Sequence, residues 1–289
     1  MTHTRHIIPV SGKDSLATAL VQTTRQPDLP YEFLFNDVRA ELPETYQWLD
    51  MVEARTGWSI VRTGVSLPDL IDRRGGFLPS VRARYCTREC KIKPMEAMLG
   101  RDPCVVYYGL RADETRTGYV PLGKPNITPQ YPLQELGIDL RGVYAILDAQ
   151  DLTPPTFHWE RVYLAVHAVL GGWNDWDTRL TRAERGSLFA WRTRANCFFC
   201  FFQRQYEFLG LREHHPDLFA RALSMEARGY TFQPGWGLAN LDNESARVKI
   251  FDRRVNDVVK MIRRRFDENT ATWEDTEISR TSCGLLCGK

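Results

Sequence analysis

The stretch Val10-Ser11-Gly12-Lys13-Asp14-Ser15 lies close to the amino terminus and decides the fold. It follows a short apolar run, Arg5–Pro9, that is typical of a strand, and it precedes Leu16–Thr24, where apolar residues recur at helical spacing. A strand, a Ser/Gly turn and a helix start together form an anion site, because the unpaired N–H groups and the positive dipole end of the helix point into the turn. Gly12 permits a close backbone approach, and Lys13 adds a point charge for phosphate oxygens.

Two common phosphate loops do not fit this stretch. A Walker loop has a glycine six residues before its lysine, and that position is Ile7. The dinucleotide fingerprint has three spaced glycines, and the stretch has only Gly12. The alternative to an anion site is a helix start that is simply well capped.

The early part of the chain alternates between strands and helices. Tyr31–Phe35 is typical of a buried strand, residues 41–57 of a helix, and Trp58–Arg62 of a third strand. This alternation predicts an α/β fold with a parallel sheet and helices on both faces. Ligands bind at the carboxyl ends of such strands, where Ser11–Lys13 and the pair Asn36–Asp37 both fall.

The later part of the chain predicts a change of architecture. A fourth strand is expected at Pro103–Gly109 and a helix at Leu140–Ala149, before Thr153–Pro155 breaks the chain. We therefore predict a nucleotide-binding domain over residues 1–152. Residues 153–289 are predicted to form a mainly helical, cysteine-containing region with a flexible cysteine-bearing tail.

Composition narrows the class of protein. A net charge of +2 over 289 residues gives no global field for binding nucleic acid, so a basic footprint has to be local. The polar start of the chain does not resemble a secretory signal, and no apolar run is long enough to span a membrane. Seven cysteines in such a chain favour metal or catalytic thiols over a disulfide scaffold. We expect a soluble cytoplasmic protein.

The loop resembles the SGGxDS-type loop of the PP-loop ATP pyrophosphatases, one glycine short. These enzymes have an adenine nucleotide α-hydrolase-like fold, bind ATP and cleave it between the α- and β-phosphates, adenylating a substrate. Residues Ser11–Ser15 have the ATP-using Lys-Asp form of the loop. In this they resemble the sulfate adenylyltransferase small subunit and the DNA phosphorothioation sulfurtransferase.

Three further segments resemble the phosphoadenosine-phosphosulfate (PAPS) reductase branch of that superfamily. The positions that keep its DTG-x-E-x-P-E-T run are Asp37, Glu41, Pro43, Glu44 and Thr45, with Val38 and Arg39 in place of Thr-Gly. The positions that fit its R-x-C-T-x-x-x-K-x-x-P segment are Arg84, Cys86, Thr87, Lys91 and Pro94. The positions that fit its strand-end G-x-R-x-x-E turn are Gly109, Arg111 and Glu114.

The resemblance implies that this chain binds ATP with Mg²⁺. The residues it assigns to the nucleotide are Ser11, Gly12, Lys13, Asp14, Ser15, Asp37, Arg84, Lys91 and Arg111. Lys13 and Arg111 are the candidate catalytic cations, because a guanidinium suits bidentate contacts with phosphate oxygens. The alternatives are a turn cap for Asp37 and a structural ion pair for Arg111 beside two acids.

Two cysteine pairs form a candidate metal centre. Cys197 and Cys200 are a Cys-x-x-Cys pair, and Cys86 and Cys90 lie about a hundred residues earlier. Four thiolates suit a [4Fe–4S] cluster, which adenylyl-sulfate reductases hold with a different cysteine spacing, or a structural zinc ion. Absence of any metal is the third alternative.

The tail Thr281–Lys289 carries another pair of cysteines. PAPS reductases end in a Glu-Cys-Gly-Leu-His-type tail whose cysteine attacks the substrate sulfur, and Cys283-Gly284-Leu285 matches its core. Cys283 and Cys287 suit a nucleophile with a resolving partner, or a persulfide carrier. The alternative is two incidental thiols.

A basic helix is predicted between Ala246 and Phe266. Its apolar residues form one stripe, and its opposite face carries Arg247, Lys249, Arg253, Arg254, Lys260, Arg263 and Arg264. Such a face is either simply solvated or contacts a phosphate backbone.

Three functions compete at this point. The first is an ATP-dependent adenylating enzyme that takes part in sulfur transfer, with a nucleic-acid phosphate as one candidate acceptor and a sulfur- or electron-donor protein as partner. The second is a thiol-dependent PAPS or adenylyl-sulfate reductase with Cys283 as nucleophile. The third is a non-catalytic module that senses nucleotides or binds nucleic acid. The sequence does not determine the oligomeric state.

Overall fold

A computed structural model of the chain describes residues 4–115, 118–121, 123–194 and 196–267. The described residues form two compact units, one made of residues 4–70 and 84–155 and the other of residues 71–83 and 156–267. The short segment 71–83 thus groups with the later part of the chain. Each unit is described separately below.

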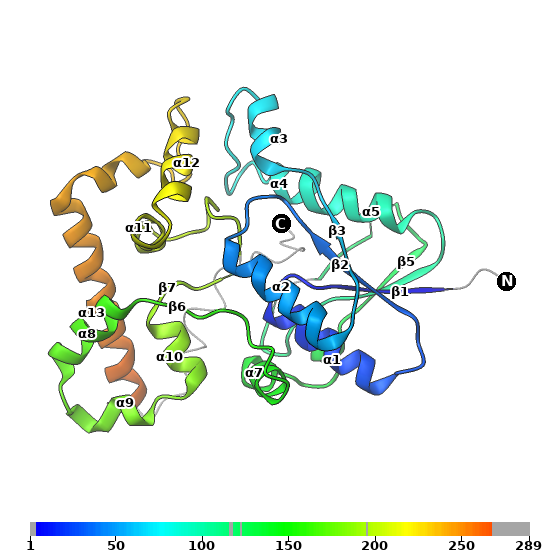
Figure 1. The fold of residues 1–289 in the computed structure, drawn as a ribbon, viewed down its shortest axis with the longest axis horizontal. Coiled ribbons are helices and arrows are strands. Elements are labelled where there is room, and N and C mark those ends of the chain that lie inside the picture. Colours follow the sequence, from blue (N-terminus) through cyan, green and yellow to red (C-terminus); the bar gives the residue numbers. More distant parts are fainter. Residues whose placement is uncertain (1–3, 116–117, 122, 195, 268–289) are drawn as a thin grey trace. The chain divides into compact units, whose positions relative to one another are not determined.

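The first unit is built on a five-stranded sheet whose strands are in the order β3-β2-β1-β4-β5; Figure 1 labels four of these strands, β1, β2, β3 and β5. All neighbouring strands are parallel. The strands are β1 (Arg5–Pro9), β2 (Tyr31–Asn36), β3 (Ile60–Thr63), β4 (Cys104–Tyr107) and β5 (Ile127–Gln130). The predicted parallel α/β sheet is therefore confirmed.

The helices of the first unit come between these strands, except the last two, which follow β5. They are α1 (Lys13–Arg25), α2 (Pro43–Thr56), α3 (Leu67–Arg73), α4 (Tyr85–Thr87), η1 (Arg88–Ile92), α5 (Lys93–Leu99), α6 (Pro132–Glu135) and α7 (Leu140–Ala149). The last residues of α3 belong to the segment that groups with the second unit.

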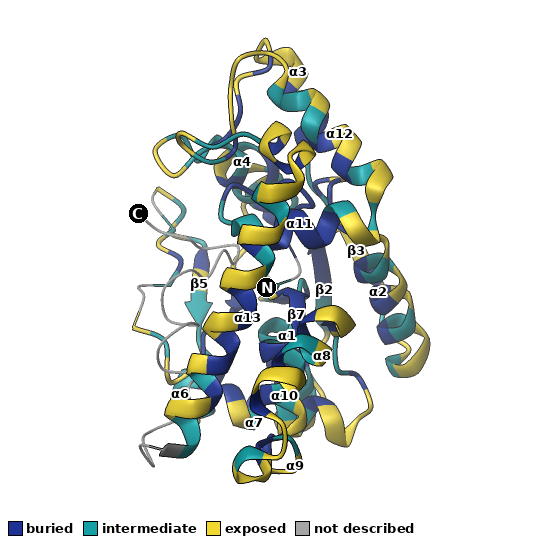
Figure 2. Cartoon of the chain, turned by 90° about the vertical axis from the view of Figure 1, so that its left-hand side faces the viewer, coloured by how far each residue is buried: buried dark blue, intermediate teal, exposed yellow. Residues whose placement is uncertain are grey.

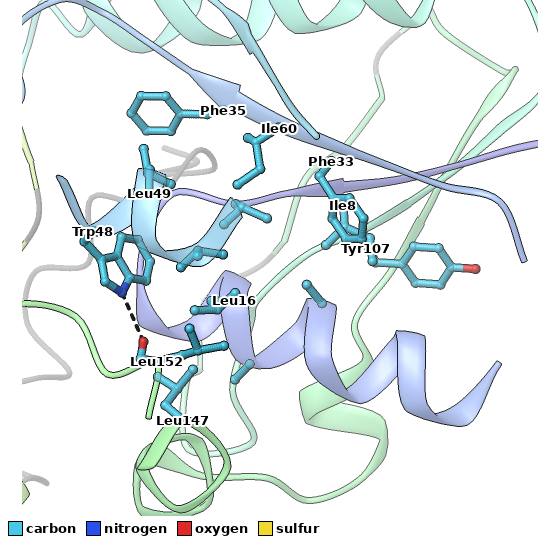
Figure 3. Packing of buried hydrophobic residues seen from close by; sticks show 14 of the residues in the cluster. Ile8, Leu16, Phe33, Phe35, Trp48, Leu49, Ile60, Tyr107, Leu147 and Leu152 are labelled. Atoms are coloured by element: carbon cyan, nitrogen blue, oxygen red, sulfur yellow. Dashed lines mark hydrogen bonds between the residues drawn. The ribbon is translucent and has the colours of Figure 1, made fainter. Parts of the chain in front are cut away.

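Helices cover both faces of the sheet. Adjacent residues of a strand point to opposite faces, so they pack against different helices. Ile8 and Phe33 pack with the apolar residues of α1, α2 and α7 (Figure 3). Ile7 and Leu34, their neighbours in the chain, pack instead with Met95 and the rest of the α5 face. The prediction of helices on both faces is confirmed.

A hydrogen bond ties the end of this unit to its core. Trp48, on α2, is buried and its Nε1 donates to the carbonyl oxygen of Leu152 at 3.0 Å (Figure 3). Leu152 itself packs in the same cluster as Leu16 and Leu147. The segment just before Thr153–Pro155 is thereby held against α1 and α2.

The second unit is mainly helical, as predicted. Its elements are β6 (Phe157–His158), α8 (Glu160–Leu170), η2 (Trp173–Asp175), α9 (Trp176–Arg179), α10 (Arg182–Leu188), β7 (Ala190–Arg192), α11 (Gln205–His214), α12 (Pro216–Glu226), η3 (Leu238–Asp242) and α13 (Glu244–Asp267). β6 and β7 form a short antiparallel ribbon. Within the described ranges, no helix is both long enough and apolar enough to cross a membrane.

Candidate functional site

The candidate site lies where the order of strands reverses direction along the chain. β1 sits between β2 and β4, so the chain moves to one side of β1 for β2 and β3 and to the other side for β4 and β5. In open α/β sheets, ligands bind beyond the carboxyl ends of the strands at such a switch point. The loop Val10–Gly12 follows β1 and the turn containing Arg111 follows β4, so both border this position.

The loop after β1 is organised by one serine hydroxyl. Ser15 Oγ accepts hydrogen bonds from the backbone N–H groups of Ser11 at 2.8 Å and Gly12 at 3.1 Å. The same hydroxyl donates to the Gly12 carbonyl oxygen at 3.0 Å. The capping that the sequence offered as an alternative is thus present. A phosphate that binds these two amides must take the place of this hydroxyl.

Lys13, Asp14 and Arg111 form a connected group of charges at the first turn of α1. Lys13 Nζ donates to Asp14 Oδ2 at 3.2 Å, and an Arg111 terminal nitrogen donates to Asp14 Oδ1 at 3.1 Å. The Arg111 side chain is only 3% exposed, whereas those of Lys13 and Asp14 are 29% and 22% exposed. The structure therefore brings together two of the predicted phosphate-binding cations, ninety-eight positions apart in the chain.

Further carboxylates hold the Arg111 guanidinium in place. Arg111 Nε donates to Asp113 Oδ1 at 2.9 Å, and a terminal nitrogen donates to Asp113 Oδ2 at 3.1 Å. Glu114 accepts from the Arg111 backbone N–H at 3.1 Å and also faces the guanidinium. Burial alone would lower the pKa of Arg111, but the charges of Asp14, Asp113 and Glu114 raise it. The ion pair offered as an alternative is therefore present, and it aims Arg111 at the β1 loop.

The Asp14 carboxylate is stabilised by its two cationic neighbours. Burial raises its pKa, but Lys13 and Arg111 outweigh burial, and the pKa of Asp14 lies below its ordinary value. A lowered carboxyl pKa stabilises the folded state above the pKa of the unfolded chain, about 3.9 for aspartate. That contribution is lost as the pH falls through the folded-state pKa.

We expect the stability difference between wild type and Asp14→Asn to depend on pH. Wild type should be the more stable protein at pH 7, because the variant loses the attraction to Lys13 and Arg111. The difference should begin to narrow below about pH 4, where Asp14 of the unfolded chain becomes protonated, and should vanish as the pH falls through the lower pKa of the folded state. Urea unfolding at several pH values measures it. Asp28→Asn, at an exposed aspartate with no ion pair in the described chain, is the control and should show no such trend.

Two glycines near the loop have different structural roles. A Cβ on Gly109, just after β4, would lie 2.6 Å from the Asp14 carbonyl carbon and 2.6 Å from the Ser15 backbone nitrogen. Gly109 therefore lets the β4 turn touch the backbone of α1. A Cβ on Gly12 would meet nothing within 4 Å, and the Gly12 φ of 175° is extended backbone that any residue adopts. The conformation of the loop therefore does not require glycine at position 12.

Substitution by alanine should mainly affect stability at Gly109 and mainly affect ligand binding at Gly12. Gly109→Ala should lower the free energy of unfolding by about 2 kcal/mol, since backbone atoms have to move to admit the methyl group. Gly12→Ala should cost about 1 kcal/mol or less; if the loop binds ATP as the resemblance implies, the methyl group should also weaken that binding, because it would lie where the backbone approaches the phosphates. Thermal unfolding and ATP titration measure the two effects. Unchanged ATP affinity in Gly12→Ala would contradict the close backbone approach.

Asp37 works as a turn cap in this structure. Its Oδ1 accepts from the Arg39 backbone N–H at 2.7 Å and from the Tyr46 hydroxyl at 2.8 Å. Arg39 has a φ of 54°, in the left-handed region that glycine favours, at the position where the motif discussed above has glycine. Within the described residues, no hydrogen bond or ion pair joins Asp37 to Lys13, Asp14 or Arg111. Its role as a nucleotide ligand stays a prediction.

Arg84 and Lys91 belong to an irregular helix of the first unit. Arg84 immediately precedes α4, and Lys91 lies on η1, a π-helical turn inserted between α4 and α5. π-turns within α-helices occur frequently at functional sites. The nucleotide-binding roles of Arg84 and Lys91 stay predictions.

The two internal cysteine pairs occupy different units. Cys86 is half-buried on α4 and Cys90 is buried on η1, whereas Cys197 and Cys200 are each 8% exposed in the second unit. Among the residues that the structure describes, no three His, Cys, Asp or Glu side chains gather as metal ligands do. Each unit by itself supplies half of a four-thiolate set, so the predicted metal centre stays a prediction.

Buried side chains from outside the motif shape the Cys197–Cys200 turn. The Cys200 backbone N–H donates to the Cys197 carbonyl oxygen at 2.9 Å. Arg192 and Gln203, which are 1% and 2% exposed, donate to that same carbonyl at 2.8 and 2.9 Å. The turn is therefore held rigidly by its own unit. Sequence reasoning missed Arg192 and Gln203, because neither lies in the Cys-x-x-Cys pattern.

The remaining predicted site residues, Cys283 and Cys287, lie outside the described residues. Asp113 and Gly109 belong to the candidate site, and only the structure shows their contacts with Arg111 and with α1. The signal for Asp113 was its place two residues after Arg111, and the signal for Gly109 was its place at the end of a strand. Neither pattern reveals a contact with the distant loop at Asp14.

The fold resembles solved structures, whereas the sequence comparisons found no match. No protein-family model matches the chain, and no curated protein matches it. The structure is similar to a phosphoadenylyl-sulfate (PAPS) reductase from Candida auris in complex with phosphate, at 20% identity and a TM-score of 0.41. The similarity covers 53% of this chain and 75% of that protein. At this level the likeness carries no argument about activity, and the fold class rests on the strand order and packing described above.

Proposed function

We propose that this chain is an ATP-dependent adenylating enzyme that takes part in sulfur transfer. The observation that supports the proposal best is the meeting of Lys13 and Arg111 at Asp14, at the switch point of the sheet. Two cations there, one on the first turn of α1 and one fixed by a carboxylate pair, suit the phosphates of a bound nucleotide. The Lys-Asp form of the loop favours a triphosphate.

The proposed first reaction is an attack on the α-phosphorus of ATP. An acceptor oxygen forms a bond to that phosphorus, the bond to the bridging oxygen breaks, and pyrophosphate leaves. Lys13 and Arg111 are expected to stabilise the negative charge on the phosphate oxygens in the transition state. Asp113 keeps two nitrogens of Arg111 occupied, which fixes the plane of the guanidinium before the nucleotide binds. Mg²⁺ would supply further charge neutralisation, and Asp14 would hold it once Lys13 and Arg111 turn from its carboxylate to the phosphates.

The proposed second reaction uses the tail cysteines. A persulfide on Cys283, loaded by a sulfur-donor protein, attacks the acceptor atom that bears the adenylated oxygen; the bond between that atom and the oxygen breaks, and AMP leaves with the oxygen. Cys287 then attacks the sulfur of Cys283, which releases the product thiolate and leaves a disulfide between the two cysteines. An external thiol reductant restores both thiols.

Product analysis tests the proposal. ATP and a sulfur donor should yield pyrophosphate and AMP in an acceptor-dependent manner.

The tail sequence Cys283-Gly284-Leu285 favours a second candidate, a thiol-dependent PAPS or adenylyl-sulfate reductase. That enzyme would instead release sulfite from the sulfonucleotide and lose activity in Cys283→Ser. Tight ATP binding with neither product would favour a non-catalytic nucleotide-sensing module.

A cofactor at the four internal cysteines remains part of the proposal. Each pair is compact enough to supply two thiolates to a [4Fe–4S] cluster or a zinc ion, and no step above depends on such a group. Iron, sulfide and zinc analysis of anaerobically purified protein tests it. If both cysteine pairs bind the same metal centre, Cys86→Ser and Cys197→Ser should each remove the metal.

A further inference from the structure

The helix α13 separates its cations into two kinds. Arg254 and Arg265 are used inside the second unit, where Arg254 donates to the Leu188 carbonyl oxygen at 2.6 Å and Arg265 pairs with Glu184 at 3.1 Å. Other cations of the same helix face outward. The exposed ones are Lys249, Arg253, Lys260, Arg263 and Arg264. Figure 2 shows exposed and buried residues alternating along α13.

Four of the exposed cations lie on one face of the helix. Lys249, Arg253, Lys260 and Arg263 recur at steps of four, seven and three residues, which is the spacing of a single helical face. They are called the cationic stripe below. At 1.5 Å per residue, the stripe is about 21 Å long. Asp252 and Asp257 fall at its edges.

The cations of the stripe are not paired with other side chains in the described part of the second unit. Among the described residues, none of its four members forms an ion pair or a hydrogen bond. No direct pairing therefore neutralises these four charges, and they outnumber the two aspartates at the edges of the stripe. The net charge of the chain is only +2, so a basic surface for an anionic partner has to be local, and this stripe is such a surface.

The apolar face of α13 is already used by the fold. Ile250, Val258 and Ile262 are buried, and Phe251 packs edge-on against Trp159 of the same unit. A helix that inserts into a membrane surface needs its apolar face for the lipid. Since α13 presents mainly charge to solvent, its outward face suits a polyanion better than a membrane.

We propose that the cationic stripe is a docking surface for the phosphate backbone of nucleic acid. Charge complementarity carries the proposal, because a nucleic-acid backbone offers a regular line of negative charge, one per about 1.7 Å of duplex axis. The contact is independent of base sequence, since Lys and Arg contact phosphates here rather than base edges. The proposal concerns the second unit alone and does not depend on ATP chemistry at Lys13.

The test measures how binding depends on salt, using the full chain without ATP and a mixed-sequence duplex DNA. The variants are Lys249→Gln/Arg253→Gln and Lys260→Gln/Arg263→Gln, in which glutamine preserves helix propensity. Each pair should reduce the slope of log K against log salt by about 1.8 and weaken binding at 0.1 M salt about 60-fold. The matched control is Arg25→Gln/Arg101→Gln, which removes equal charge from exposed positions in the first unit.

Several outcomes would overturn the proposal. One is an unchanged slope in both stripe variants, and another is an equal loss in the control, which would indicate a general charge effect. A third is equally strong, equally stripe-dependent binding to polyglutamate or to phosphatidylserine vesicles. Circular dichroism and thermal unfolding confirm that the variants are folded. Lys13→Ala should bind DNA as wild type does, so failure of the stripe and failure of the adenylation proposal can be told apart.

Discussion

Replacing Lys13 with alanine is expected to lower ATP-dependent pyrophosphate release by about 10²- to 10³-fold, the usual effect of removing one preorganised charge from a transition state. The Lys13 side chain is 29% exposed and pairs only with Asp14 in the described chain, at 3.2 Å. Such a pair contributes little to folding, so the loss should appear in kcat/KM and not in the free energy of unfolding. Release of pyrophosphate from ATP measures it.

The control for this experiment is Lys93→Ala in the same unit. Lys93 forms an exposed ion pair with Glu89 at 2.8 Å, four residues away on the helix. It shares the charge and the partner type of Lys13 but not its place at the switch point. Equal activity in the two variants would contradict a phosphate-binding role for Lys13, even if ATP turnover itself were found.

Arg111→Leu is expected to have the largest effect on stability, about 3 kcal/mol. The guanidinium is 3% exposed and lies among Asp14, Asp113 and Glu114. Its removal leaves these carboxylates to repel one another at the start of α1. The cost should be at the low end for a broken buried ion pair, because Asp14 and Asp113 are 22% and 34% exposed and keep some hydration. Urea unfolding at pH 7 measures it.

A surface arginine with the same kind of partners provides the control. Arg62 pairs with Asp50 at 2.7 Å and Glu53 at 3.1 Å, but its side chain is 34% exposed. Arg62→Leu should therefore cost about 1 kcal/mol or less. The Arg111→Leu defect should also shrink in acid, because protonated carboxyls no longer repel one another. If Arg111→Leu and Arg62→Leu lower the free energy of unfolding equally, or if the loss in Arg111→Leu does not depend on pH, the buried ion pairs of Arg111 do not stabilise the fold.

Local patterns were sufficient for the fold class. The apolar runs before Val10 and around Phe33 predicted parallel strands, and the structure pairs Ile8 with Phe33 in the sheet. The helix expected at Leu140–Ala149 has those same bounds. The strand β5 (Ile127–Gln130) was not predicted, because its four residues include a proline and show no apolar alternation. Its place is determined by pairing with β4, a contact between distant segments.

For the candidate site, the sequence by itself determined which residue types were present and which lay at strand ends. Lys13 and Arg111 were both identified in this way. Only the tertiary structure decided that they meet at Asp14, that Asp113 orients Arg111, and that Gly109 touches the first turn of α1. The physical reason is that a strand end, a capping serine or an acid beside an arginine is a local pattern. The strand order that makes β1 and β4 neighbours results from burying both faces of one sheet, which involves the whole unit at once.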